Sequence, residues 1–174
     1  MLKIISGKFK GRKLNNIKVD SIRPTRAIVK KSIMDSIMFF ENKNILDLCC
    51  GVGTLGLEAI SRGALSVDFV DNSKNSINIL KKNIELLEID NSCTIFNSDM
   101  FRFLKKHDSK YDIIFADPPY YKYNFFELFP MISRLINENG ILIYESEKFK
   151  VGEQGSIKIK TFGNTQIIIF KEKQ

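Results

Sequence analysis

The sequence predicts an α/β fold, in which a doubly wound and mostly parallel sheet ends in an antiparallel hairpin. Short apolar runs, such as 44–48 and 111–116, alternate with segments such as 74–87, where apolar residues recur at steps of three and four. Repeated strand–helix units of this kind build parallel sheets that carry helices on both faces. The last two β-rich runs, 156–162 and 165–171, are joined by Gly-Asn, a two-residue hairpin signal. The hairpin therefore adds one antiparallel strand to the sheet.

The remaining elements follow in chain order. Residues 2–19 alternate loosely and carry two glycines, which predicts a small N-terminal β-ribbon. Pro24 forces the residue before it out of helical geometry, and Thr25 can cap a helix that the apolar spacing predicts over 26–40. Pro130 is expected to bend the helix that contains it or to mark its first turn, and Asn139-Gly140 to turn the chain into the next strand. The other strands and helices are expected at 44–48, 54–62, 67–70, 74–87, 94–97, 101–106, 111–116, 125–136 and 141–145.

Composition narrows the class of protein. The 174 residues are 44% hydrophobic and 27% charged, as in ordinary globular domains. No apolar run approaches the roughly 18 residues that a membrane span needs, and the first residues carry no apolar segment typical of a signal peptide. Three cysteines and a single histidine argue against a disulfide framework and against a zinc site. We therefore expect a cytoplasmic protein without a membrane or metal partner.

The charge is concentrated at the front of the chain. Residues 1–31 hold ten lysines and arginines against one acidic residue, while the whole chain has a net charge of +7. Such a local excess suggests a polyanionic partner, above all a nucleic acid, although a basic arm that only aids solubility is the alternative. The candidate RNA-binding residues are Lys8, Lys10, Arg12, Lys13, Arg23, Thr25 and Arg26.

A glycine-rich loop between the strand at 44–48 and the helix at 54–62 predicts a cofactor site. The segment 47–56 contains G-x-G-x-x-G, a pattern that would equally suit a dinucleotide. Asp47 favours S-adenosylmethionine (SAM) over a dinucleotide. A carboxylate at the strand's end repels a pyrophosphate but attracts the ammonium group of SAM. A glycine turn without a cofactor is the structural alternative. The expected loop contacts to SAM are Asp47, Cys49, Gly51, Gly53 and Thr54.

Two further acidic residues follow the next strands. Asp71 ends its strand 20 residues after Gly51, where it can accept hydrogen bonds from both ribose hydroxyls. Asp99 ends the following strand and can accept one from the adenine amino group. Each has a structural alternative, the capping of the helix that follows. Asn72 and Met100, the next residues along the chain, complete the expected cofactor site.

The strand at 111–116 runs directly into Asp117-Pro118-Pro119-Tyr120, the candidate catalytic loop. Two prolines stiffen the loop and leave its carbonyl groups as acceptors. An exocyclic amino group is a poor nucleophile until acceptors hold its hydrogens, and Asp117 and the Pro118 carbonyl can do so. Tyr120 supplies a flat face for a flipped base. The sequence thus predicts methyl transfer to a nucleobase amino group, the alternative for the loop being a surface turn.

These residues resemble the class I SAM-dependent methyltransferases that act on amino groups, with a Rossmann-like sheet. The whole chain is similar to the RsmD family, on the basis of residues 4–14, 23–25, 47–63, 117–120 and 144–147. We expect a monomer, and the resemblance implies methylation of a guanine N2 in 16S rRNA, on the small subunit or an assembly intermediate. It also implies one domain over 1–174, with a basic ribbon (1–22), a lead-in helix (23–40) and a SAM-binding catalytic core (41–174).

Some positions depart from the family pattern, and other functions stay open. The segment 26–31 lacks the family's usual acidic-Arg-Val-Arg-Glu, Asp71 replaces a common Glu, and Cys49-Cys50 replaces Phe-Ala. The first departure leaves a one-to-one role for Arg26 in doubt. The alternatives are an N6-adenine methyltransferase, methylation of a protein glutamine amide, and a non-catalytic RNA-binding assembly factor. The last needs none of the acidic residues above.

Overall fold

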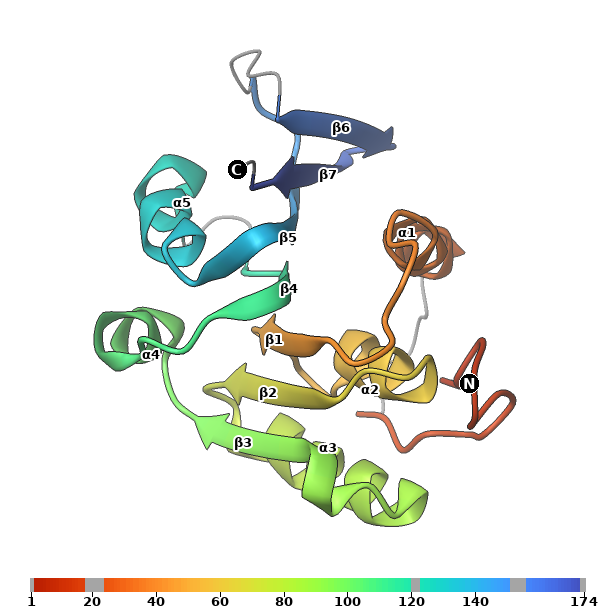
Figure 1. Cartoon of the computed structure of the whole chain (residues 1–174). Helices are drawn as coiled ribbons and strands as arrows, with labels where there is room; N and C mark the ends of the chain where they lie inside the picture. Colours follow the sequence, from red (N-terminus) through yellow and green to blue (C-terminus); the bar gives the residue numbers. More distant parts are fainter. Residues whose placement is uncertain (1, 18–23, 120–122, 151–155, 173–174) are drawn as a thin grey trace.

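The computed structural model describes residues 2–17, 24–119, 123–150 and 156–172, with the side chains of 24–26 excepted. Its strands form one sheet in the order β3-β2-β1-β4-β5-β7-β6, in which β1 to β5 pair in parallel and β7 is antiparallel to both β5 and β6 (Figure 1). The mostly parallel α/β fold predicted from the sequence is confirmed. The strands are β1 (Asn44–Leu48), β2 (Ser66–Asp71), β3 (Cys93–Asn97), β4 (Tyr111–Ala116), β5 (Ile136–Glu147), β6 (Ile157–Phe162) and β7 (Thr165–Lys171).

Helices cover both faces of the sheet (Figure 1). Apolar residues of α1, α2, α3 and the N-terminal segment pack on one face, and those of α4 and α5 on the other. The stripe of α3 shows why: Ile77, Leu80 and Ile84 repeat at helical spacing and are all buried. The helices are α1 (Pro24–Asp35), α2 (Thr54–Ser61), α3 (Lys74–Leu87), α4 (Met100–Lys106) and α5 (Phe125–Ser133), with a 3₁₀ turn at Asp90–Ser92.

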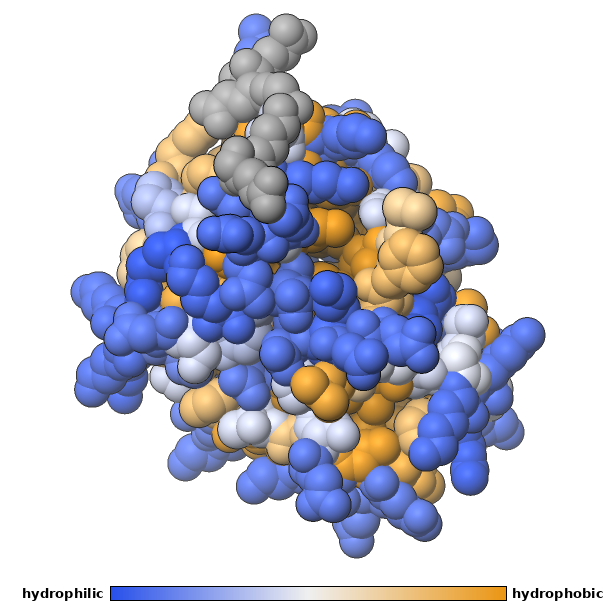
Figure 2. Space-filling view, in the orientation of Figure 1, coloured by the Kyte–Doolittle hydropathy of each residue, from blue (hydrophilic) through white to orange (hydrophobic). Residues whose placement is uncertain are grey.

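The first helix ends earlier than predicted. α1 stops at Asp35, although Ile37 and Phe40 beyond it are still buried. The apolar spacing continues past the helix because an irregular segment packs on the same core. Periodicity alone does not distinguish such a segment from a continued helix. Ile28, one of the apolar residues whose spacing predicts this helix, is 57% exposed. The view in Figure 2 is mainly hydrophilic, with apolar patches that include one over α1.

The predicted turn at Asn139-Gly140 is wrong, because these residues lie inside β5. The register against β4 jumps from Tyr111↔Ile136 to Ile113↔Ile141, which makes a bulge. Asn139 has a φ of 60°, so the turn-forming residues supply a left-handed conformation that a bulge also requires. The terminal hairpin adds two strands instead of one, and Pro130 lies inside α5.

The N-terminal ribbon is short and is held against α2. Its two arms share one antiparallel bridge, Lys3↔Lys13, between irregular stretches. The buried carboxylate of Glu58 accepts hydrogen bonds from the backbone N–H groups of Ile5 (2.8 Å) and Ser6 (2.9 Å). The arms also pair through backbone hydrogen bonds, from the Ile4 N–H to the Arg12 carbonyl and from the Leu14 N–H to the Leu2 carbonyl (both 3.0 Å). Docking on a buried acid adds to this pairing, and period-2 patterning does not predict it.

Candidate active site

Four acidic residues line up along one edge of the sheet. Asp117 follows β4, Asp47 lies near the end of β1, Asp71 ends β2 and Asp99 follows β3, and these strands are neighbours in that order. The direction of strand order reverses between β1 and β4. Open α/β sheets bind ligands at such a switch point, outside the carboxyl ends of the strands.

Two glycines give the loop between β1 and α2 its backbone conformation. Gly51 and Gly53 have positive φ values of 55° and 84°, a region that side chains disfavour. A Cβ at Gly51 would meet nothing within 4 Å, so the backbone there is open to a ligand. Gly56 has a different task, because its Cβ would lie 2.3 Å from the Phe69 ring and would push α2 off the sheet. Thr54 is the first residue of α2.

Asp47 lies beneath this loop. Its side chain accepts a hydrogen bond from the Gly56 backbone N–H (2.9 Å), and the residue is only 2% exposed. Loss of hydration raises the pKa of Asp47 to about 7, and the nearby Asp71 charge adds to the rise. The carboxylate thus joins β1 to α2, and an ammonium group would have to reach it through the loop.

Asp71 connects the loop to a small cavity. Its two carboxylate oxygens accept hydrogen bonds from the Gly51 N–H (2.8 Å) and the Ser73 N–H (2.8 Å). α3 is capped by Ser73, whose hydroxyl accepts from the Ser76 N–H, so Asp71 does not serve as the cap. The cavity has a volume of about 60 Å³. It is lined by Cys49, Val70, Asp71, Asn72, Ser98, Met100, Pro119 and Tyr123, which include four of the predicted cofactor residues.

Asp99 caps the helix that follows it, which was the structural alternative to binding adenine. It caps α4 through Oδ1, which accepts from the N–H groups of Phe101 (3.0 Å) and Arg102 (3.2 Å). Its Oδ2 accepts a hydrogen bond from the Tyr123 hydroxyl (3.3 Å). The capping interaction orients the carboxylate, and the second oxygen faces the aromatic residue that borders the cavity.

The candidate catalytic loop separates the small cavity from a larger one. Asp117 is exposed, and its backbone N–H donates to the Leu48 carbonyl (3.3 Å), which ties the loop to β1. Pro118 is buried. Tyr120 lies outside the described residues. Pro119 and Tyr123 line both cavities, so the two sites meet at the loop.

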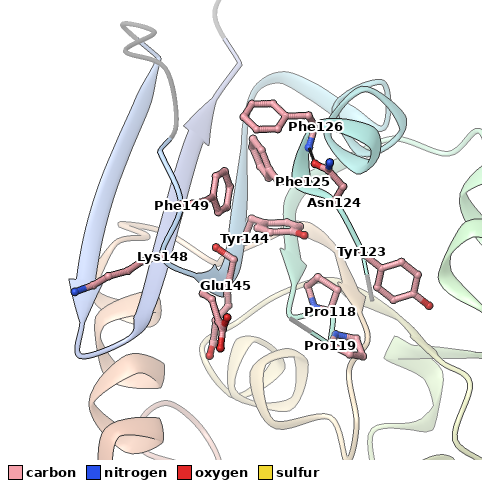
Figure 3. A pocket seen from close by; sticks show the side chains of 12 residues that line it. Pro118, Pro119, Tyr123, Asn124, Phe125, Phe126, Tyr144, Glu145, Lys148 and Phe149 are labelled. Atoms are coloured by element: carbon pink, nitrogen blue, oxygen red, sulfur yellow. Dashed lines mark hydrogen bonds between the residues drawn. The ribbon is translucent and has the colours of Figure 1, made fainter. Parts of the chain in front are cut away.

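The larger cavity has a volume of about 360 Å³ and aromatic walls (Figure 3). The Phe125 ring lies 5.0 Å from the Tyr144 ring and 5.4 Å from the Phe149 ring, measured between centroids. Burial raises the pKa of Tyr144, whose hydroxyl therefore stays neutral. A cavity of this volume between aromatic rings can hold a flat heterocycle.

Sequence reasoning missed most of this cavity. Phe125 and Tyr144 read as ordinary core residues, and Tyr123 carried no motif. The only signal was the segment 144–147, which matched the family pattern without a physical explanation. The complete lining is Pro118, Pro119, Tyr123, Asn124, Phe125, Phe126, Tyr144, Glu145, Ser146, Glu147, Lys148 and Phe149.

The predicted RNA-binding residues lie on the docked N-terminal segment. Lys8, Lys10, Arg12 and Lys13 are all exposed. The Lys8 backbone N–H donates to the Ser61 carbonyl (2.7 Å), so the basic side chains project from a fixed backbone. Arg23 lies outside the described residues, and so do the side chains of Thr25 and Arg26.

The described residues contain no group of three or more His, Cys, Asp or Glu side chains placed to hold a metal ion. None of the helices in that part of the chain has the length and apolar character that crossing a membrane requires.

Comparison with known proteins places this geometry in a family. The model of the family described as "Conserved hypothetical protein 95" matches residues 2–171. The chain belongs to this family, which is the RsmD family. The resemblance seen in the sequence is therefore confirmed.

Three similar proteins illustrate the relationship. "Putative rRNA methyltransferase YlbH" of Bacillus subtilis is 32% identical over 183 residues, which cover 99% of this chain and 100% of the relative. "Ribosomal RNA small subunit methyltransferase D" of Haemophilus influenzae is 35% identical and covers 86% of this chain and 80% of its own length. A solved structure, "Putative methyltransferase yhhF from Escherichia coli", superposes with a TM-score of 0.87 at 24% identity, over 99% of this chain and 98% of that one. The last comparison supports the fold.

Proposed function

We propose that the chain is a SAM-dependent methyltransferase that modifies the N2 amino group of one guanine in 16S rRNA, on the small subunit or an assembly intermediate. The observation that carries the proposal is the meeting of two cavities at Pro119 and Tyr123. One offers a carboxylate beside an open glycine loop, and the other offers aromatic walls. A single chain lines both, so a monomer suffices. The family membership and the named relatives support an rRNA substrate and a cytoplasmic enzyme.

The residues of the smaller cavity fit SAM. Asp71 is held in place by two backbone N–H donors, and each carboxylate oxygen keeps a second lone pair for a ribose hydroxyl. The cavity volume of about 60 Å³ accommodates only part of the cofactor. The rest would lie over the glycine loop, where a Cβ at Gly51 meets no atom. SAM, when bound, supplies a methyl group activated by its sulfonium.

The loop 117–119 would prepare the accepting amino group. The Asp117 carboxylate and the Pro118 carbonyl each accept one amino hydrogen, which directs the nitrogen lone pair toward the cofactor side of the loop. Asp117 also takes the proton released by the reaction. Stacking between the aromatic walls aligns the flipped base, and such alignment can contribute on the order of 7–11 kcal/mol to lowering a barrier.

The basic segment would grip the ribosomal RNA. Lys8, Lys10 and Arg12 project from the backbone that Glu58 and Ser61 hold, and contacts of this type to phosphates position a substrate without reading its sequence. The pocket then selects the base.

The test is transfer of labelled methyl from SAM to small subunits that lack the modification, with bare 16S rRNA and duplex DNA run alongside. Digestion to nucleosides identifies the product. We expect label at guanine N2, on subunits in preference to free RNA. Label at adenine N6, on DNA alone, or on no substrate would refute the proposal.

A further inference from the structure

Two polar side chains that face each other across β5 and β7 each contain a buried atom without a hydrogen-bond partner. Among the described residues, the buried side-chain atoms without a hydrogen bond are Lys30 Nζ, Ser146 Oγ and Gln166 Nε2. Lys30 Nζ lies 3.3 Å from the Glu58 carboxylate, so its charge is compensated. Ser146 and Gln166 are 8% and 3% exposed and face each other in the β5–β7 register. Buried polar groups are satisfied in most proteins, and such an exception calls for an explanation.

Ser146 lines the large cavity. Side chains alternate along a strand, so Ser146 lies on the same face of β5 as Tyr144, one step further toward the strand's end. The Tyr144 ring forms the aromatic wall with Phe125 and Phe149 (Figure 3). A nearly buried hydroxyl thus stands beside the place where a flat base would stack.

The charged lining of this cavity consists of two carboxylates and one lysine, Lys148, whose side chain points away from the aromatic rings (Figure 3). Glu145 and Glu147 flank Ser146 in the sequence and line the same cavity. Carboxylates accept hydrogen bonds only, whereas a serine hydroxyl can donate one. Guanine presents an acceptor, O6, next to a donor, N1–H, beside its amino group. Adenine presents the reverse order at the corresponding positions.

We propose that Ser146 is a specificity-determining residue that reads the target base. Its hydroxyl donates to O6 of guanine, while a carboxylate of Glu145 or Glu147 accepts from N1–H. Adenine has an amino group where guanine has O6, so the donating hydroxyl of Ser146 would face another donor. Its unprotonated N1 would face a carboxylate, which is another acceptor. This inference rests on the proposed function, since it assumes a guanine in the cavity.

The test compares substrates that all keep the 2-amino group. Once the wild-type enzyme has identified the target nucleotide, small subunits are reconstituted with guanine, 2-aminopurine or 2,6-diaminopurine at that position. The wild type should prefer guanine over both analogues in kcat/KM. Ser146→Ala should lose about tenfold in kcat/KM on guanine and little on 2-aminopurine, because 2-aminopurine has no O6. Its affinity for SAM, measured by calorimetry, should not change.

Two further variants separate base reading from folding. Ser146→Thr keeps the hydroxyl and should restore the preference for guanine. Ser133→Ala removes an exposed hydroxyl on α5 that donates to the Pro130 carbonyl, and should leave all three substrates unaffected. Guanine methylation with an unchanged guanine preference in Ser146→Ala would overturn the inference alone. Wild-type label at adenine N6 would overturn the inference and the proposed function together, and the labelled nucleoside distinguishes the two results.

Discussion

Replacement of Asp47 by asparagine should stabilise the protein, by an amount that depends on pH. Folding raises the pKa of this carboxyl from 3.8 to about 7, mainly because burial removes its hydration. Below about pH 4 the carboxyl is protonated in both states, and folding is unaffected. As the pH rises toward 7 the unfolded chain ionises and the folded chain does not, so the free energy of unfolding falls. Three pH units correspond to about 4 kcal/mol.

Asparagine cannot ionise, and its side-chain oxygen can still accept from the Gly56 N–H. The unfolding free energy of Asp47→Asn should therefore match the wild type near pH 4 and exceed it by up to about 4 kcal/mol above pH 7. Urea denaturation across pH 4–8 measures the difference. Asp90→Asn, at an exposed position in the 3₁₀ turn, controls for the loss of one negative charge. A difference between Asp47→Asn and wild type that stays constant with pH would refute the reasoning.

The same carboxyl should couple SAM binding to pH. An ammonium group beside Asp47 favours the ionised form, so wild-type affinity should weaken as pH falls below 7, by at most about tenfold per pH unit. The Asp47→Asn variant should bind SAM more weakly and lose this dependence. Calorimetry in two buffers of different ionisation enthalpy would detect the proton release, and its absence in the wild type would mean that the ammonium lies elsewhere.

Three other changes test the remaining assignments. Asp117→Ala should abolish methyl transfer while calorimetry shows little change in SAM binding; an equal loss of binding would mean that the residue belongs to the cofactor site. Joint replacement of Lys8, Lys10 and Arg12 by alanine should weaken binding to subunits. The slope of log K against the logarithm of the salt concentration should become smaller in magnitude by about two to three. An unchanged slope would show that the segment does not contact RNA. Glu58→Gln should lower the free energy of unfolding by roughly 3 kcal/mol in urea denaturation and expose the N-terminal segment to proteolysis, because the buried Lys30 loses its counter-charge. Unaltered stability would show that the Lys30–Glu58 ion pair is not formed.

Local signals were sufficient for the alternation of strands and helices. α3 matches the predicted 74–87 because its apolar stripe and its serine cap lie within one turn of each other and need no distant partner. Asn139-Gly140 shows the limit. A turn and a bulge both need a residue with positive φ, and only pairing with β4 decides between them.

The chemistry of the candidate site divides in the same way. The acidic residues at strand ends, the glycine loop and the Asp-Pro-Pro loop could be assigned to one site from sequence, because strand direction places all of them at one edge of the sheet. Three features became visible only in the folded chain: Asp47 is buried, Asp99 caps α4, and Tyr144 and Ser146 line one cavity with Phe125. The burial of Asp47 depends on the packing of α2 over β1, and the cavity depends on the packing of α5 against β5. A sequence motif predicts neither this packing nor the loss of water from a carboxylate.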